Sequence, residues 1–237
     1  MKRIIIVFSL LLSSFISFSQ TSEVELSNLA LEKLNNNKNK EALKILKTVL
    51  RKNKKAAWAY NFKSIAKRNL GDYKAALKDL DKALKIDSNY ATAHYNKGEI
   101  LYKNLHLYDE AIIEYTNAIK IDNSKEWYYC NRGECYAFLG KYKNAIKDYD
   151  KAIEINPNSI YVYGNKAVVY ITLQKYQKAL IICDRALKID SSAASIYLQK
   201  AVALYNLKEY YQACKNVKKS VELGDPIAYK YVDIFCK

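Results

Sequence analysis

The sequence is poor in the residues that interrupt helices and in those that bind metals. Only 6 glycines and 2 prolines occur among 237 residues, so few breaks are expected beyond short turns such as Leu70-Gly71-Asp72. The two histidines, His94 and His106, belong to no H-E-x-x-H pair and to no cysteine cluster. The glycines are isolated, so none can form a loop that cradles phosphate. We therefore expect no enzyme, no metal site and no cofactor.

Sequence signals for β-strands are also scarce. The apolar residues follow the helical period and hardly ever alternate over the length of a strand. An all-α fold is the prediction.

What the chain does contain is a repeat of thirty-four residues, clearest in residues 126–159. Five further copies keep its register, at residues 23–56, 57–90, 91–125, 160–193 and 194–227. The copy at 91–125 carries one extra residue, which we place near Leu105 and His106, in the turn between two helices. A fixed period of this length indicates stacked helical hairpins.

The residues at fixed places of this repeat identify a family. The eighth, seventeenth, twentieth, twenty-fourth, twenty-seventh and thirty-second places of the clearest copy are Gly133, Tyr142, Ala145, Tyr149, Ala152 and Pro157. This pattern resembles the tetratricopeptide repeat (TPR) family. The resemblance implies a right-handed superhelical solenoid of six TPR helical hairpins, in which small residues allow helices to approach closely. The outer copies fit less well, since Asn39 stands where tyrosine is usual.

The end of the chain is predicted to form a capping helix over residues 227–236. Pro226 can begin a helix, and Tyr231, Ile234 and Phe235 are apolar at helical spacing. Such a cap would cover the apolar end of a stack of repeats.

The first nineteen residues differ from the rest. Lys2 and Arg3 precede an apolar run from Ile4 to Phe18, and Ser17-Phe18-Ser19 has small residues at the positions that a signal peptidase reads. The run is shorter than the ~20 residues of a membrane-spanning helix. We predict a signal peptide over residues 1–19 in preference to an uncleaved anchor. Residues 20–237 would then act in a periplasm or outside the cell, with membrane contact only during export.

The charge is strongly basic. The sequence has 39 Lys and Arg against 24 Asp and Glu; without Lys2 and Arg3, 37 basic residues remain and the net charge is +13. Such a chain can attract an anionic partner, yet the lysines recur on second helices, where they are expected to face water. Nucleic acid is therefore not the favoured partner. The densest basic run, residues 51–55, lies in a turn between hairpins.

Five cysteines in an exported protein require an explanation. Cys130, Cys135 and Cys183 are expected to be small core residues. Cys214 lies in the last complete second helix and Cys236 at the end of the cap, so an antiparallel return can bring them within bonding distance. We predict a disulfide between them, which would stabilise the cap by ~3 kcal/mol at best.

The groove lined by the first helices is the binding surface that the TPR resemblance implies. Its sixth place holds Asn96, Asn131 and Asn165 in consecutive copies, followed by Gln199. An amide both donates and accepts hydrogen bonds, and some TPR proteins use an asparagine ladder to hold a peptide backbone. The alternative is that these residues are simply polar and compatible with a surface.

Aromatic and acidic residues flank this predicted ladder. Trp127 and Tyr161 share the second place, and Tyr95 and Tyr102 flank Asn96. These rings can contact apolar side chains of a ligand or pack between repeats. Glu99 and Glu134 share the ninth place and would favour a peptide with lysine or arginine.

We therefore expect a non-enzymatic scaffold that binds an extended peptide of another protein, with no small-molecule substrate. One alternative is an electrostatic binder of anionic envelope polymer or nucleic acid, which would show steep salt dependence. Another is a purely structural subunit of an envelope complex, which would require a large exposed apolar patch.

Overall fold

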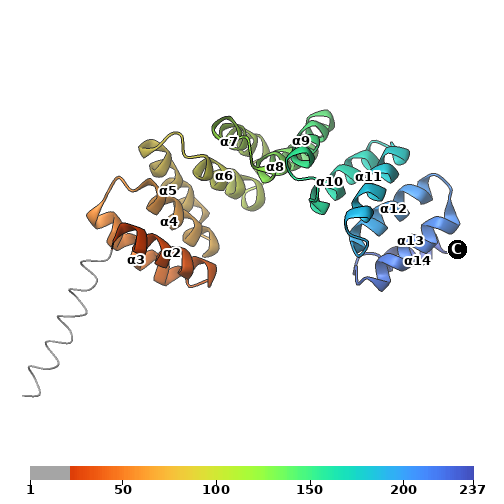
Figure 1. The fold of residues 1–237 in the computed structure, drawn as a ribbon, viewed down its shortest axis with the longest axis horizontal. Coiled ribbons are helices and arrows are strands. Elements are labelled where there is room, and N and C mark those ends of the chain that lie inside the picture. Colours follow the sequence, from red (N-terminus) through yellow and green to blue (C-terminus); the bar gives the residue numbers. More distant parts are fainter. Residues whose placement is uncertain (1–21) are drawn as a thin grey trace, which may run out of the picture. The chain divides into compact units, whose positions relative to one another are not determined.

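A computed structural model describes residues 22–237, and the predicted signal peptide, residues 1–19, lies outside the described residues (Figure 1). The α-helices are α2 (Glu23–Asn35), α3 (Asn39–Lys52), α4 (Ala57–Asn69), α5 (Tyr73–Ile86), α6 (Ala91–Glu99), α7 (Tyr108–Ile121), α8 (Glu126–Phe138), α9 (Tyr142–Ile155), α10 (Ile160–Thr172), α11 (Tyr176–Ile189), α12 (Ala194–Asn206), α13 (Tyr210–Glu222) and α14 (Tyr229–Phe235). A short π-helix, η1 (Ile100–Asn104), follows α6. No strand occurs in residues 22–237, and the predicted all-α fold is confirmed.

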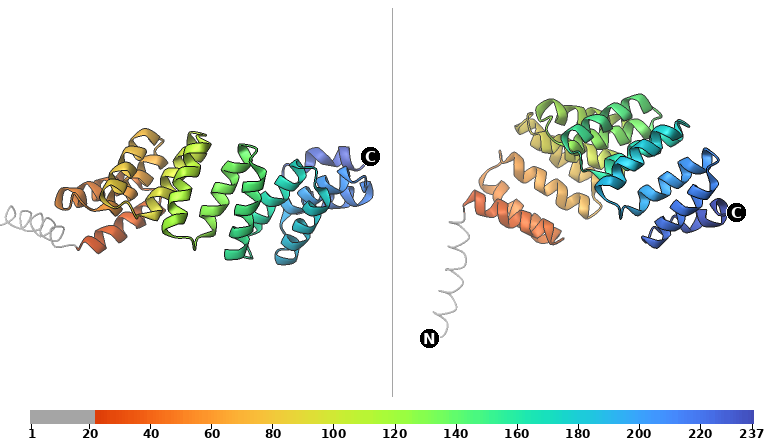
Figure 2. Two further views of the ribbon diagram at one scale, coloured as in Figure 1. Left: turned by 90° about the horizontal axis from the view of Figure 1, so that it is seen from above. Right: turned by 45° about the vertical axis from the view of Figure 1, so that its right-hand side comes forward.

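The chain divides into two compact units. The described part of the first unit ends at Ile100, and the second runs from Leu101 to Lys237. Within each unit, consecutive helices pack as antiparallel pairs, namely α2 with α3, α4 with α5, α8 with α9, α10 with α11 and α12 with α13 (Figure 2). In the part of the chain that the structure describes, no helix is both long and apolar enough to span a membrane.

Small residues line the close approach between the helices of each pair. At the twentieth place, Ala76 in the first unit and Ala145 in the second are fully buried, and Ala83 and Ala152 at the twenty-seventh place are buried as completely. A larger side chain at these places would force the helix axes apart. The repeat pattern of small residues thus reflects the packing of each hairpin.

The eighth place illustrates the same constraint most sharply at Gly133. A Cβ atom built on Gly133 would lie 2.8 Å from Cε1 of Tyr149 and 3.3 Å from Cβ of Asp148. The first unit has Ser64 and Leu80 at the two corresponding places, both fully buried. Glycine is therefore required where the twenty-fourth place holds a tyrosine ring.

Cations at the seventh place pair with carboxylates of second helices. The pairs are Lys63 with Asp79 (3.2 Å), Lys97 with Asp81 (3.0 Å), Arg132 with Asp148 (2.7 Å), Lys200 with Asp184 (2.6 Å) and Lys166 with Asp150. Part of the lysine excess therefore links neighbouring helices.

The turn inside each hairpin uses a left-handed backbone at one fixed place. Positive φ angles occur at Asn37, Gly71, His106, Gly140, Gln174 and Lys208. Glycine adopts this conformation without a steric penalty, whereas other L-residues pay about 1–2 kcal/mol. The fold thus imposes the same turn even where the sequence lacks glycine.

The extra residue of the third repeat is accommodated inside a helix. The π-helix Ile100–Asn104 has one more residue per hydrogen-bonded turn than an α-helix. We predicted the insertion in the turn near Leu105 and His106, but His106 has the φ of 56° that is typical of this turn. The widened helical turn just before it absorbs the insertion instead.

The C-terminal helix begins at Tyr229, two residues later than predicted. The N–H of Ile227 donates to Oδ1 of Asp225 at 2.8 Å, so the chain after α13 first forms a turn. Phe235 is buried, and its ring stacks on that of Tyr205 with centroids 4.5 Å apart. The helix therefore covers the last hairpin.

The cysteines fall into two groups. A disulfide joins Cys214 on α13 to Cys236 after α14, with the two Cα atoms 4.7 Å apart. Cys130, Cys135 and Cys183 are buried free thiols, as the sequence predicted. Burial raises the pKa of each of these thiols to about 12.

Candidate functional site

The predicted groove residues divide between the two units. Tyr95, Asn96 and Glu99 lie on α6 of the first unit. The others lie on first helices of the second unit, with Trp127, Asn131 and Glu134 on α8, Tyr161 and Asn165 on α10, and Gln199 on α12. The predicted groove residues thus form two sets, one in each unit.

In the first unit, the predicted groove residues bond to their own neighbours. Asn96 is only 8% exposed, and its Nδ2 donates to Oδ1 of Asn61 at 2.8 Å. Glu99 accepts from Nη1 of Arg68 at 3.3 Å, which offsets its charge. Asn96 therefore presents little surface to a ligand, and Glu99 already has a cationic partner.

In the second unit, the amides are also partly engaged. Asn131 is 6% exposed, and Nδ2 of Asn165 donates to Oε1 of Glu134 at 2.6 Å. Gln199 is half-buried, with its side chain 3.4 Å from the place where Gly164 would carry a Cβ. Contact between these amides and a peptide backbone stays a prediction.

Glu134 lines a pocket of about 340 Å³ within the second unit. Its other lining residues are mainly aromatic or apolar, namely Tyr102, Ala137, Phe138, Tyr142, Tyr149, Tyr161, Asn165, Val168, Val169 and Thr172. Most of them come from α8, α9 and α10, neighbouring helices of this unit (Figure 1). The volume falls at the lower end of the range for small-ligand sites, about 300–1,000 Å³.

The carboxylate of Glu134 is buried and only partly hydrogen-bonded. The side chain is 6% exposed, and its Oε1 accepts from the hydroxyl of Tyr161 and from the amide of Asn165. Its Oε2 has no hydrogen-bond partner among residues 22–237. Within the second unit, no Lys, Arg or His side chain forms an ion pair with Glu134.

The charge of Glu134 affects the groups around it. Burial raises the pKa of Tyr161 to about 12, with the hydrogen bond to Glu134 adding to the effect. Burial, followed by the nearby charge of Glu134, also raises the pKa of Tyr102 and of Tyr149. The three hydroxyls therefore stay protonated at neutral pH.

A cluster of aromatic rings lies beside the pocket, in contact with its lining residue Phe138. The rings of Tyr108 and Phe138 stack with centroids 5.1 Å apart, and the ring of Tyr102 lies 5.9 Å from that of Phe138. Phe138 and Tyr161 are both largely exposed, at 64% and 63%. The surface beside Glu134 thus combines a buried carboxylate with accessible aromatic rings.

Sequence reasoning named Glu134, Tyr161, Asn165 and Tyr102 as groove residues but missed Phe138 and Tyr149. Tyr149 occupies a place that is usual for packing, which hid its part in the pocket. A comparison of copies would have placed Tyr102 beside Glu134, since the twelfth place holds Arg68 in one copy and Tyr102 in the next.

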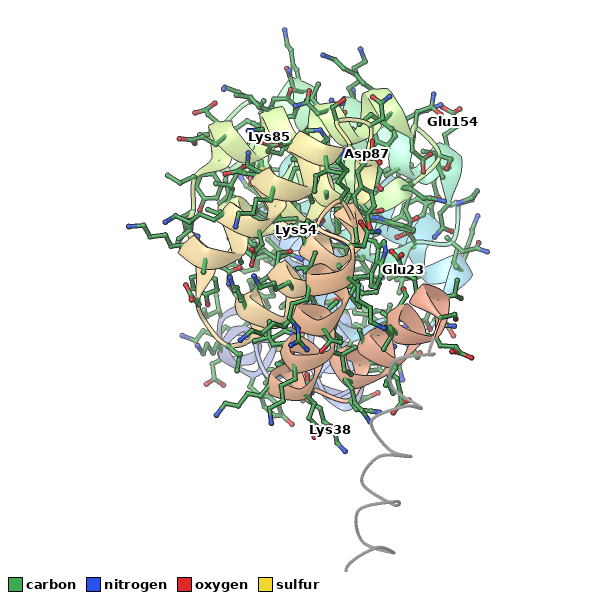
Figure 3. The ribbon with its side chains drawn as sticks, turned by 90° about the vertical axis from the view of Figure 1, so that its left-hand side faces the viewer. Glu23, Lys38, Lys54, Lys85, Asp87 and Glu154 are labelled. Atoms are coloured by element: carbon green, nitrogen blue, oxygen red, sulfur yellow. A yellow bond between two sulfur atoms is a disulfide. The ribbon has the colours of Figure 1, made fainter. Side chains whose placement is uncertain are left out.

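A second pocket, of about 520 Å³, lies in the first unit and is strongly basic. Its lining includes Lys47, Arg51, Lys54, Lys63, Lys67 and Lys82, together with Leu43, Leu50 and Tyr60. Lys63 and Lys67 both pair with the buried carboxylate of Asp79, at 3.2 and 2.5 Å. Lys54, near the centre of Figure 3, belongs to the basic run 51–55 noted in the sequence.

Comparison with known families gives matches along the middle of the chain. Three family models described as "tetratricopeptide repeat" match residues 91–125, 127–159 and 148–181. A fourth, described as "TPR repeat", matches residues 66–104. The chain belongs to the tetratricopeptide repeat family. Among proteins with curated descriptions, none matches this TPR chain in sequence.

Several solved structures share this TPR fold. PilW, described as a widely conserved type IV pilus biogenesis factor, is 16% identical with a TM-score of 0.76 over 92% of this chain and 100% of its own. PilF of Pseudomonas aeruginosa is 19% identical with a TM-score of 0.76, covering 88% and 95%. YrrB, described as a TPR protein with an unusual peptide-binding site, is 20% identical with a TM-score of 0.67, covering 79% and 97%. At these identities the likeness establishes the fold.

Proposed function

We propose that this TPR protein is a non-enzymatic, exported scaffold that binds an extended segment of another protein on the surface formed by α8 and α10 of the second unit. The observation that carries this proposal is the Glu134 pocket, where a buried carboxylate lies among aromatic rings. Aromatic residues in partly buried pockets supply much of the energy of protein interfaces. Peptide binding by YrrB, which has the same fold, supports this class of function.

Exposed aromatic side chains beside the pocket are the proposed peptide contacts. Trp127 and Tyr161 are both exposed at the second place of consecutive repeats, one on α8 and the other on α10. A peptide that crosses both helices can bury these two rings, while Asn165 and Gln199 offer amides along its path.

Affinity capture tests the scaffold proposal. Residues 20–237 are used to capture proteins from the envelope extract of the source cell, at low and high salt. We expect one protein to be retained through high salt and lost with Tyr161→Ala. The matched control is Tyr211→Ala, since Tyr211 is an even more exposed tyrosine, on α13 of the same unit. Retention that is equal for both variants would contradict binding at α8 and α10.

The basic pocket of the first unit favours a second candidate function, the electrostatic binding of an anionic polymer. Four of its six cations, Lys47, Arg51, Lys54 and Lys82, form no ion pair with a carboxylate within the described part of the first unit. Lys82 instead lies 5.7 Å from the centroid of the Tyr60 ring. Such a cluster attracts phosphate or carboxylate groups through charge.

Salt dependence distinguishes this candidate from the scaffold. Polyphosphate binding is measured over a salt series for the native chain and for the triple variant Lys47→Ala, Arg51→Ala, Lys54→Ala. The matched control removes three exposed lysines from second helices of the second unit, Lys143, Lys147 and Lys188. A smaller salt slope in the first variant alone would support the basic pocket. Equal slopes in both variants would indicate diffuse charge.

A further inference from the structure

We propose that the Glu134 pocket binds an ammonium or guanidinium group on an alkyl stem, the chemistry of a lysine or arginine side chain. The inference rests on the proposed function in one respect, since it assigns the cation to a segment of a protein partner. A free alkylammonium compound carries the same chemistry and is separated from it by the experiment below.

No cation offsets the charge of Glu134 within the second unit. Its Oε1 accepts two hydrogen bonds, both from neutral donors, Tyr161 and Asn165. Its Oε2 has none among the described residues. A buried carboxylate that lacks a cation is costly, and a buried acceptor without a partner costs about 1–3 kcal/mol. A cationic ligand would supply both the charge and the missing donor.

The same place one repeat earlier holds a carboxylate that does have a cation. Glu99 also stands at the ninth place, and there the preceding first helix supplies Arg68, whose Nη1 lies 3.3 Å from the carboxylate. For Glu134 the preceding repeat supplies Tyr102, an uncharged side chain that lines the same pocket. The chain thus satisfies one of two equivalent carboxylates with its own cation and leaves the other without one.

The walls of the pocket also suit a cation on an alkyl stem. The rings of Tyr102, Phe138, Tyr149 and Tyr161 line the same pocket as the carboxylate. Aromatic faces attract cations, and the attraction increases when the cation is desolvated, to about 2 kcal/mol. Val168 and Val169 add apolar surface that suits an alkyl stem. An anionic or uncharged ligand would not gain the attraction between a cation and the aromatic faces.

Access to the carboxylate runs past Tyr161. Oε2 itself is shielded from solvent, whereas the Tyr161 side chain is 63% exposed and its hydroxyl is bound to Oε1. Rotation of this side chain would open a path to Oε2, where the entering cation donates a charge-assisted hydrogen bond to the acceptor that has none. Binding therefore moves the Tyr161 ring.

Matched peptides test the proposal on the full mature chain, residues 20–237. Two peptides of alternating alanine and serine differ only at a central residue, which is lysine in one and norleucine in the other. Their affinities are measured by calorimetry, and the resonances of Tyr102 and Tyr161 are followed by NMR. We expect the lysine peptide to bind about tenfold more tightly or better. A ratio near one for the native chain would overturn the proposal.

Three variants tie the preference to Glu134. Glu134→Gln keeps the shape of the side chain and removes its charge, and Tyr102→Arg supplies the internal cation found in the first unit; both should abolish the preference for lysine. Glu99→Gln is the matched control, because Glu99 already has Arg68 as its partner, and it should leave the preference unchanged. Persistence of the full preference in Glu134→Gln would place the cation elsewhere.

A third ligand separates this inference from the proposed function. If n-butylammonium binds to the native chain but not to Glu134→Gln, while neither peptide binds, cation binding at Glu134 is supported and peptide binding is contradicted. The ligand is then a small molecule. If both peptides bind equally, the scaffold stands and the cation pocket is wrong.

Discussion

The two units differ in what lies beside the glutamate at the ninth place of the repeat. In the first, the ninth-place Glu99 has Arg68 as an internal cation, while in the second the equivalent Glu134 faces Tyr102 and other rings. The repeat thus keeps the carboxylate but changes its partner. The ninth-place carboxylate forms a structural ion pair in one unit and becomes a candidate ligand site in the other.

The two units also differ in cysteine content. All five cysteines lie in the second unit, and its end is closed by the disulfide between Cys214 and Cys236. Each unit also has a single tryptophan, Trp58 in the first and Trp127 in the second. Replacing one tryptophan with phenylalanine leaves a fluorescence probe for the other unit, so the stability of each can be followed separately.

Removal of the disulfide is expected to have the largest effect and to be confined to the second unit. In the Cys214→Ser, Cys236→Ser variant, we expect the free energy of unfolding of that unit to fall by about 3 kcal/mol, because the bond closes a loop with a sequence separation of 22 residues. Urea unfolding followed through Trp127 measures the loss. The transition followed through Trp58 should not move, and equal shifts of both transitions would mean that the two units unfold together.

The eighth place offers a second contrast. Gly133→Ser should destabilise the second unit by about 2 kcal/mol, because the new Cβ would overlap the Tyr149 ring. The first unit tolerates a serine there, with Leu80 at the place of Tyr149. Tyr149→Leu should therefore recover part of the loss when it is combined with Gly133→Ser, and a double-mutant cycle measures this coupling.

Gly164→Ser is the matched control for Gly133→Ser, because both glycines lie inside helices of the second unit. Its Cβ would meet only side-chain atoms at 3.4 Å or more, and the exchange also raises helix propensity. We expect a change within about 0.5 kcal/mol of the native chain. Equal losses at Gly133 and Gly164 would show that overlap with Tyr149 is not the cause.

Exchanging the two ninth-place environments is expected to have a smaller effect than Gly133→Ser. Arg68→Tyr should destabilise the first unit by about 1 kcal/mol, a modest amount because the Arg68 side chain is partly exposed and solvent screens the pair. Tyr102→Arg should stabilise the second unit by a similar amount, since it gives Glu134 a cation. Thermal unfolding of the single-tryptophan chains measures both, and a loss of stability in Tyr102→Arg would contradict the equivalence of the two places.

Much of the fold could be predicted from the sequence because the repeat places record contacts inside one hairpin. Ala145 and Ala152 mark helices that touch within a single copy, and Gly140 marks the turn between them. The extra residue of the third repeat was harder to locate, since neither Leu105 nor His106 shows that the helix before them can widen into a π-turn. The start of α14 also depended on a local bond, from Ile227 to Asp225.

The candidate site was less accessible to sequence reasoning because it depends on contacts between copies. Glu134 and Tyr161 were identified from their places, but their hydrogen bond joins two repeats. The deep burial of Asn96 and Asn131 likewise depends on how neighbouring first helices pack, which one copy does not reveal. Comparison of equivalent places across copies, as for Arg68 and Tyr102, recovers part of this information.

The burial of three of the five cysteines has a consequence for oxidation chemistry. Five thiols allow ten different pairings, yet Cys130, Cys135 and Cys183 are enclosed in the core, and burial keeps them protonated at neutral pH. Thiol–disulfide exchange requires an accessible thiolate. Once folded, the chain therefore keeps one disulfide, and we expect an oxidising environment not to rearrange it.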